Sequence, residues 1–256
     1  MQAAEALRDL FEEHLSTVRL HPDLGGLEEA MSYALAGGGK RIRPVLCLAT
    51  AEAAGGRVDE ALDAATALEL VHTFSLVHDD LPAMDDDNER RGRPSTHVQF
   101  GEGVGLLAGD ALLAEALRLA LTYPDPAVAR ELTNATLGMI GGQFLDISGL
   151  DVDLAVLHRL KTGRLFAAAV GLGLATARVP EDAQLTWRVF GDELGLLFQA
   201  VDDVLDGDGY VVRLGVDGAR EVAAGAAARA KASLRSTRGQ TDVLEHIVDE
   251  LLNRTA

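Results

Sequence analysis

Helical periodicity runs through nearly the whole sequence and restricts the fold more than any other feature. Residues 59–78, 105–121 and 193–205 are rich in Ala and Leu, with apolar residues three and four positions apart. Alternating runs of Val, Ile and Thr are missing, and aromatic residues make up only 4% of the chain, which disfavours a β-sandwich or barrel. The sequence therefore predicts an all-α fold.

Glycine and proline divide this helical pattern into roughly ten segments of about 12 to 20 residues. Breaks are predicted at residues 37–39, 55–56, 81–82, 91–94, 123–126, 141–142, 178–180 and 207–209. The sequence contains neither a Ser/Gly/Pro-rich linker nor a repeat of 20 to 50 residues. We therefore expect one domain spanning residues 1–256.

The charge balance limits the partners of the chain. A net charge of −17, from 40 acidic and 23 basic residues, argues against a nucleic-acid or anionic-membrane surface. Residues 1–15 are charged and amphipathic, unlike a signal peptide, and Cys47 is the only cysteine. No apolar run reaches the ~18 residues of a spanning helix. We expect a cytoplasmic protein without a membrane span, which would meet lipids only as substrates.

The first acidic cluster lies in the sequence LVHDDLPAMDDDNERRGRP, residues 76–94. Asp79 and Asp80 close a helical run, Pro82 disfavours its continuation, and Asp85 follows where the chain can curl back toward the first pair. Converging carboxylates suit Mg²⁺, which completes its octahedron with water and substrate phosphate. The alternative is a solvated acidic loop that caps a helix.

A second acidic cluster, FQAVDDVLD, occupies residues 198–206. Asp202 and Asp206 are four residues apart, so on a helix they lie on one face about 6 Å from each other. Without a cation between them this repulsion costs some tenths of a kcal/mol. Two such clusters facing each other across a bundle predict a cage for several Mg²⁺ ions and one diphosphate.

Basic residues accompany the acidic clusters. The sequence GGGKRIRP, residues 37–44, places Lys40 and Arg43 after a glycine run, where backbone N–H groups also attract an anion. Arg90 and Arg91 follow the first cluster, and Lys161 lies between the two. These bases are candidate phosphate ligands, although arginines next to aspartates can also serve only to neutralise them.

Together these motifs resemble the trans, head-to-tail prenyl diphosphate synthase family, whose short-chain members make geranyl, farnesyl and geranylgeranyl diphosphate. The resemblance is greatest to bacterial farnesyl-forming members and covers nearly the whole chain. The motifs that carry it, in family order, are GGGKRIRP, His72, DDLPAMD with RRGRP, GGQFLD (141–146), KTG (161–163), FQ (198–199) and DDVLD (202–206).

This resemblance implies an isoprenoid synthase-type helical bundle around a central cavity, and a homodimer. Three Mg²⁺ ions on the allylic diphosphate would be held by Asp79, Asp80, Asp85 and Asp202, and more loosely by Asp203 and Asp206, with help from Arg90 and Lys161. Isopentenyl diphosphate would be held by Lys40, Arg43, His72 and Arg91. Thr162 and Gln199 would place oxygen dipoles near the cationic carbon chain, and the released diphosphate would be the base.

Phe74 bears on product length because it precedes Asp79 by five residues, about 7.5 Å along a helix axis. A bulky ring there would act as a floor for the growing chain. In the family an aromatic residue at this place accompanies farnesyl-forming members, which favours a C15 product. Geranyl or geranylgeranyl diphosphate remains the alternative, as does an ordinary core role for Phe74.

The sequence departs from the family after the second acidic cluster. Family members usually carry a loop of roughly twenty residues there, with a Gly-Lys pair and a later lysine, whereas residues 206–212 here pass directly into the next helical segment. The ending NRTA, residues 253–256, also lacks the usual basic character. Other interpretations are a non-catalytic partner subunit of another synthase, a cyclising terpene synthase and a calcium-binding helical protein.

Overall fold

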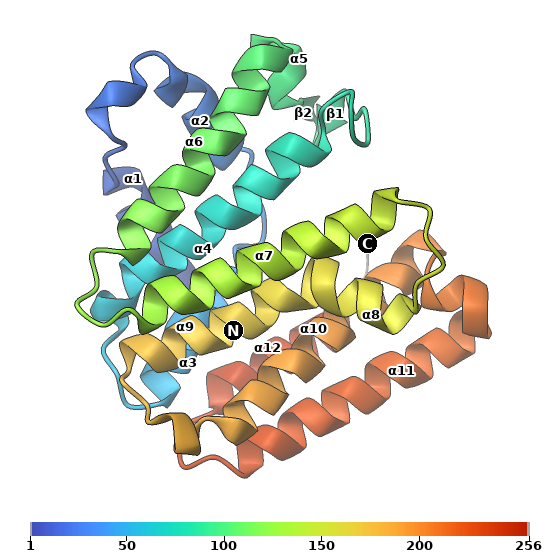
Figure 1. Cartoon of the computed structure of the whole chain (residues 1–256). Helices are drawn as coiled ribbons and strands as arrows, with labels where there is room; N and C mark the ends of the chain where they lie inside the picture. Colours follow the sequence, from blue (N-terminus) through green and yellow to red (C-terminus); the bar gives the residue numbers. More distant parts are fainter. Residues whose placement is uncertain (1, 255–256) are drawn as a thin grey trace.

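The helices follow the predicted pattern closely. The computed structural model describes residues 2–254 and is helical nearly throughout (Figure 1). The α-helices are α1 Gln2–Thr17, α2 Leu27–Leu35, α3 Ile42–Ala53, α4 Val58–Asp79, α5 Thr96–Phe100, α6 Glu102–Ala120, α7 Ala127–Ile147, α8 Leu154–His158, α9 Arg164–Thr176, α10 Leu185–Asp206, α11 Tyr210–Arg235 and α12 Asp242–Leu252. The shorter elements are the 3₁₀ turns η1 Pro22–Leu24 and η3 Glu181–Ala183, the π-turn η2 Arg159–Gly163, and the antiparallel strands β1 Glu89–Arg90 and β2 Arg93–Pro94. The predicted all-α class is confirmed.

The predicted break at residues 141–142 is wrong. Gly141 and Gly142 lie inside α7, which continues to Ile147. A Cβ at Gly142 would stand 2.4 Å from the backbone nitrogen of Lys161, so that glycine serves close packing between two segments of the chain. Composition alone does not distinguish a glycine that ends a helix from one that lets another backbone approach.

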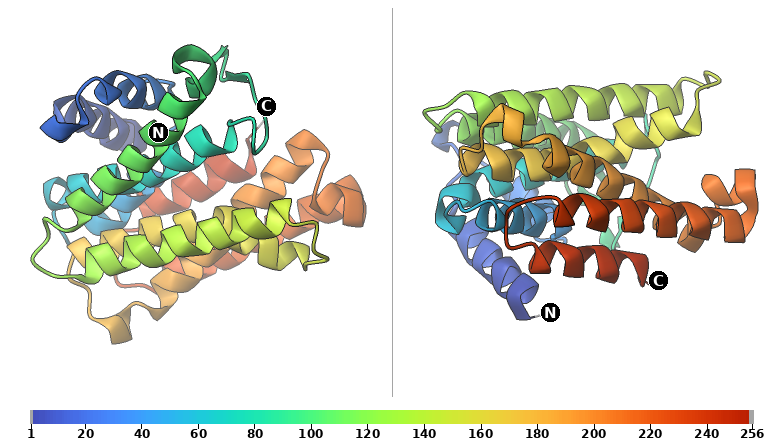
Figure 2. Two further views of the ribbon diagram at one scale, coloured as in Figure 1. Left: turned by 45° about the horizontal axis from the view of Figure 1, so that its top comes forward. Right: turned by 90° about the horizontal axis from the view of Figure 1, so that it is seen from below.

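The centre of the molecule is formed by α3, α4, α9 and α10. Helix α4 packs against α3, α6 and α9, and α9 also packs against α7 and α10 (Figures 1 and 2). Leu68 of α4, Leu46 of α3 and Phe166 of α9 are fully buried. Because α4 is covered on several sides, its buried residues include apolar side chains all around the helix.

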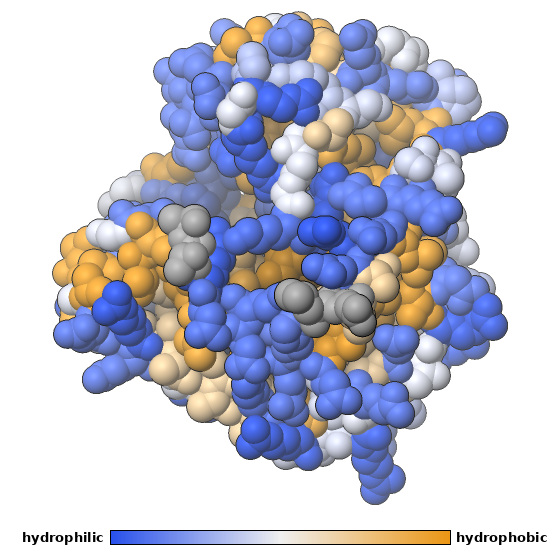
Figure 3. All heavy atoms as spheres, turned by 180° about the vertical axis from the view of Figure 1, so that it is seen from behind, coloured by the Kyte–Doolittle hydropathy of each residue, from blue (hydrophilic) through white to orange (hydrophobic). Residues whose placement is uncertain are grey.

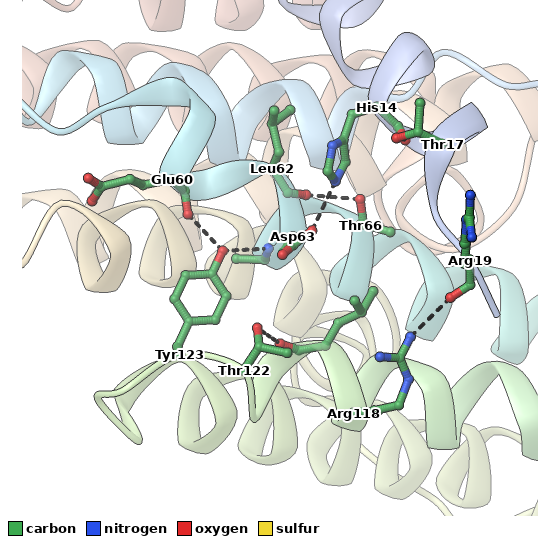
Figure 4. Close-up of polar contacts among 12 residues, drawn as sticks. His14, Thr17, Arg19, Glu60, Leu62, Asp63, Thr66, Arg118, Thr122 and Tyr123 are labelled. Atoms are coloured by element: carbon green, nitrogen blue, oxygen red, sulfur yellow. Dashed lines mark hydrogen bonds and ion pairs between the residues drawn. The ribbon is translucent and has the colours of Figure 1, made fainter. Parts of the chain in front are cut away.

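Polar contacts fix the N-terminal half of α4 to its neighbours (Figure 4). The imidazole of His14 in α1 lies 3.0 Å from the Asp63 carboxylate. The Tyr123 hydroxyl, between α6 and α7, donates to the Glu60 carbonyl and accepts from the Ala64 amide. These contacts lie at the end of α4 away from Asp79, so the acidic end projects from a firmly held helix.

Hydrophilic residues cover much of one face of the molecule, in line with a net charge of −17 (Figure 3). Seen from behind, hydrophobic residues show in patches and in a hollow among polar ones (Figure 3). Within residues 2–254, none of the helices combines the length and the hydropathy that crossing a bilayer requires.

Candidate diphosphate-binding site

The first acidic cluster forms where α4 ends. Helix α4 stops at Asp79, and the chain turns back so that the Asp85 amide donates to the Asp79 carbonyl at 2.9 Å. The predicted return of Asp85 toward the first pair is therefore present in the backbone. Asp80 is buried and accepts from Arg90 through Nη2 at 2.5 Å and Nε at 2.7 Å, while Asp85 is exposed.

Asp79 lies at the edge of the largest cavity near these motifs. Burial raises the pKa of Asp79 to about 6, Lys161 opposes the shift, and the neighbouring Asp85 adds to it. The raised pKa reflects a buried carboxylate whose lost hydration is only partly compensated by nearby positive charge. A cation would therefore bind favourably at this position.

The second acidic cluster forms at the C-terminal end of α10. The Asp202 carboxylate accepts from Arg254 at 2.5 Å, and Asp206 is exposed. Burial raises the pKa of Asp202, Arg254 opposes that shift and Asp206 adds to it. In Figure 1 the C-terminal ends of α4 and α10 lie on the same side of the molecule.

The Asp203 carboxylate accepts hydrogen bonds from two donors of the protein itself. Its two oxygens accept from the Gln199 side-chain amide at 2.8 Å and from the backbone N–H of Tyr210 at 2.7 Å. Tyr210 is the first residue of α11, so the Asp203 carboxylate caps that helix. The turn of residues 207–209 replaces the longer loop expected from the family, and Asp203 connects its two sides.

The four basic residues assigned to isopentenyl diphosphate line one pocket of about 840 Å³. They are Lys40, Arg43, His72 and Arg91. Burial lowers the pKa of Arg43 to about 10, and its guanidinium stacks over Phe166 at 4.7 Å. Arg43 Nη1 lies 3.3 Å from Nε2 of His72, whose pKa burial and the surrounding arginines hold well below its usual value. A neutral His72 can thus accept from Arg43 and leave the positive charge to the arginines.

Arg41 is a structural residue that the sequence reasoning missed. It is buried in a left-handed conformation (φ 47°) and donates to Glu69 and Glu12 at 2.7 Å each and to the Leu35 carbonyl. This anchorage fixes the chain between Lys40 and Arg43, which both line the pocket. The motif GGGKRIRP contains three basic residues, and the sequence does not indicate which of them is buried.

Arg254, within the NRTA ending, lies next to the basic pocket. The Arg254 guanidinium lies 5.4 Å from the centroid of the Phe198 ring and lines the same pocket as Lys40 and Arg43. Its contact with Asp202 joins residues 52 positions apart. Thr255 and Ala256 lie outside the described residues.

A second cavity of about 1550 Å³, part of it open solvent, adjoins this pocket, and Arg43 and His72 line both. Phe74 lines it and meets His78 edge to face at 5.0 Å. Lys161 and Thr162 of η2 also line it, and Lys161 donates to Asp146 at 2.5 Å. Gln199 does not line this cavity, and its side-chain amide donates to Asp203. The apolar cavity, with Asp79 on its lining, suits a diphosphate with a hydrocarbon tail. The adjoining basic pocket suits a second diphosphate.

The acidic residues fit Mg²⁺ chemically but do not form a complete ligand set by themselves. Among residues 2–254, no three His, Cys, Asp or Glu side chains are grouped closely enough to hold a metal ion. Hard carboxylate oxygens with raised pKa values, as at Asp79 and Asp202, suit Mg²⁺ that is also bound by phosphate. Such a site would be completed by its phosphate ligand.

A helical bundle with two acidic helix ends, one of which lines a cavity through Asp79, is consistent with the all-α isoprenoid synthase class. The family model described as "Polyprenyl synthetase" matches residues 25–224, and the chain belongs to this family. The resemblance found in the motifs is thereby confirmed.

Named relatives differ in their products. A geranylgeranyl diphosphate synthase from Cyanophora paradoxa is 45% identical over 70% of this chain and 64% of its own length. The match therefore spans less than two thirds of that relative. A farnesyl diphosphate synthase from Micrococcus luteus is 40% identical over 77% of this chain and 72% of its own length. A geranyltransferase structure from Legionella pneumophila is 34% identical and superimposes with a TM-score of 0.88, covering 99% of this chain and 97% of that one.

Proposed function

We propose that this chain condenses isopentenyl diphosphate with dimethylallyl or geranyl diphosphate to give a linear trans-prenyl diphosphate. The observation that carries the proposal is the pair of adjoining cavities, one basic and one apolar with Asp79 on its lining, which share Arg43 and His72. Two diphosphates bound there would bring their carbon chains together. Family membership and relatives named farnesyl and geranylgeranyl diphosphate synthase support the same reaction.

The allylic diphosphate would bind at the acidic helix ends through Mg²⁺, for which we propose three ions. When bound, Mg²⁺ would neutralise the leaving diphosphate. Its candidate ligands are Asp79, Asp80, Asp85, Asp202, Asp203 and Asp206. On binding the metal, Asp80 would give up its contact with Arg90. Asp203 would likewise give up its hydrogen bonds from Gln199 and Tyr210. Arg90 would then be available to the diphosphate.

The basic pocket would hold the diphosphate of isopentenyl diphosphate through Lys40, Arg43, His72 and Arg91, and Arg254 is positioned to join them. The allylic C–O bond then breaks, the isopentenyl double bond forms the new C–C bond, and a proton leaves to the released diphosphate. Lys161 would hold the allylic diphosphate, while Thr162 and Gln199 would direct oxygen dipoles toward the cationic carbon chain.

Farnesyl diphosphate is the proposed product, with geranyl and geranylgeranyl diphosphate as alternatives. Phe74 is 7% exposed and lines the apolar cavity, which supports its role as a floor. Phe74→Ala should lengthen the main product by at least one C5 unit, because removing a ring opens space beneath the chain. Phe11→Ala, which removes a fully buried ring outside this lining, is the control for general loss of packing. Unchanged product length in Phe74→Ala would remove Phe74 from this role.

A homodimer of single-domain subunits in the cytoplasm completes the proposal. Exposed apolar side chains on α6 and α7 that do not line the cavity, including Leu107 and Leu137, support an interface there. The retained motif acids argue against the second candidate, a non-catalytic partner subunit.

Incubation with Mg²⁺, isopentenyl diphosphate and each allylic diphosphate tests the proposal. Chromatography of the dephosphorylated products should reveal a longer linear alcohol, which EDTA should abolish. Lack of elongation by the pure protein, combined with activation of a second synthase, would favour the partner-subunit role.

A further inference from the structure

The π-turn η2 is held between two glycines from different helices. On one side, a Cβ at Gly142 of α7 would stand 2.4 Å from the Lys161 nitrogen and 2.7 Å from the Leu160 carbonyl carbon. On the other side, a Cβ at Gly195 of α10 would stand 2.8 Å from the Gly163 Cα. All three positions are backbone atoms, which do not move aside as a flexible side-chain end would. The turn therefore depends on the absence of side chains on both neighbours.

The shape of this turn matters because Lys161 and Thr162 line the apolar cavity. A π-turn widens the helix by about one residue per turn and changes the direction of the side chains that follow, and such turns are frequently found at functional sites. Gly163 itself does not need to be glycine, because its added Cβ would meet the His158 carbonyl at 3.6 Å and the Arg159 Cγ at 4.0 Å, both ordinary contacts. The packing requirement thus lies on the helices around the turn.

Helix α7 also holds a side chain of the turn. Asp146 follows Gly142 by four residues, so both face the same side of the helix. The Asp146 carboxylate accepts from Lys161 Nζ. Between them, Gln143 lines the cavity, and its side-chain nitrogen is buried without a hydrogen-bond partner. One segment of α7 therefore contacts both the backbone and the side chain of Lys161 and reaches the cavity.

We propose that residues 142–146 of α7 are a positioning platform for the reaction, in which Gly142 sets the backbone of the π-turn and Asp146 sets the Lys161 ammonium group. This inference rests on the proposed prenyl transfer, since it assigns the platform to aiming Lys161 and Thr162 at the allylic substrate. Gly142 and Asp146 would act through the turn and touch no substrate.

Gly142→Ala, compared with Gly141→Ala, tests the proposal. The two glycines are adjacent in α7, but a Cβ at Gly141 would have nothing within 4 Å. We expect Gly142→Ala to lower kcat on the order of 10²-fold, because small misplacements of positioned groups are costly. The KM for isopentenyl diphosphate should change less than about threefold, because that substrate would bind in the basic pocket away from the turn. Gly141→Ala should keep wild-type kinetics.

Asp146→Asn is the second variant, for the case that Gly142→Ala does not fold. It should lower kcat roughly tenfold, and Asp146→Glu should recover part of the loss. Amide hydrogen exchange of residues 159–163 gives a readout that needs no catalysis. Exchange there should accelerate in Gly142→Ala and stay at the wild-type rate in Gly141→Ala.

The outcomes separate this inference from the proposed function. Wild-type kcat and exchange in a folded Gly142→Ala, or kinetics of Asp146→Asn equal to those of wild type, would overturn the platform and leave prenyl transfer intact. A lower melting temperature with unchanged kcat would show that Gly142 only stabilises the fold, and would also overturn it. If the wild type itself elongates nothing, the proposed function fails, and the exchange comparison still decides whether Gly142 holds the turn.

Discussion

The two acidic helix ends each bind an arginine, but they obtain it from very different distances along the chain. Asp80 at the end of α4 pairs with Arg90, ten residues later, whereas Asp202 at the end of α10 pairs with Arg254, 52 residues later. The Asp80 side chain is 3% exposed, while those of Asp202 and Arg254 are 25% and 26% exposed. In the first pair only the Asp80 carboxylate is buried, since Arg90 is 33% exposed, whereas in the second pair both side chains are partly exposed.

The segments that follow the two ends differ as well. After α4 the chain curls back and forms the β1–β2 hairpin that carries Arg90. After α10 a three-residue turn, residues 207–209, leads directly into α11, whose first amide is held by Asp203. Helix α11 is kinked at Gly215, and Arg254 places positive charge beside Asp202 at this second end.

The largest effect is expected from removing one carboxylate at each end. Asp79→Asn and Asp202→Asn should each lower kcat/KM by about 10² to 10³ at saturating Mg²⁺, because each removes charge that would hold the leaving diphosphate. Steady-state kinetics measures the loss. Asp182→Asn, in the exposed turn η3 that precedes α10, should have no effect. If only one of the two acidic substitutions impaired turnover, the two ends would not act on one substrate.

The two arginines should differ in their contribution to stability. Arg90→Ala leaves the buried Asp80 carboxylate unpaired, so the free energy of unfolding should fall by roughly 2 to 3 kcal/mol. Arg254→Ala leaves a partly solvated Asp202 and should cost about 1 kcal/mol or less. Urea denaturation measures both, and Arg57→Ala, from an exposed pair, is the control. Equal losses in the two variants would remove the proposed distinction.

The short turn after α10 can be tested at two glycines. Gly207 (φ 72°, ψ 25°) is left-handed helical, and Gly209 (φ 50°, ψ −110°) also has a positive φ, so Ala should cost at least about 1 kcal/mol of stability at either position. A Cβ at Gly209 would also stand 2.2 Å from an Asp203 oxygen, whereas Gly207 faces open space. We expect Gly209→Ala to lose about 1 kcal/mol more than Gly207→Ala in thermal or urea unfolding. A larger loss at Gly207 would contradict the capping role of Asp203.

The smallest expected effect is a pH dependence from His72, which lies on α4 beside Arg43. Its pKa in the folded protein is well below 6.5, so on acidification the unfolded chain takes up the proton first. The stability that depends on neutral His72 is complete above about pH 6.5 and is lost as pH falls toward the folded pKa. Stability of the wild type should therefore fall more steeply below pH 6.5 than that of His72→Gln, measured by urea unfolding at several pH values. Parallel profiles would mean that His72 is solvated or charged.

Local patterns predicted much of this molecule. The helical periodicity of residues 59–78 led correctly to α4, and Pro82 led correctly to the return of Asp85, because both depend on neighbours in sequence. The same reasoning failed at Gly142, which lies inside α7 and lets the backbone of Lys161 approach closely. It also missed the buried contact of Arg41 with Glu69 and the contact of Arg254 with Asp202. Each joins residues that are far apart in the sequence, so local patterns do not predict it.

The sequence by itself determined the all-α class, the positions of both acidic clusters and the family, because helix periodicity and motif spacing are local properties of a chain. Only the tertiary structure decided which charges meet. It paired Asp80 with Arg90 and Asp202 with Arg254, committed Asp203 to the start of α11, and pressed α7 against the π-turn. These contacts depend on how whole helices pack, and that packing is set by the core they share.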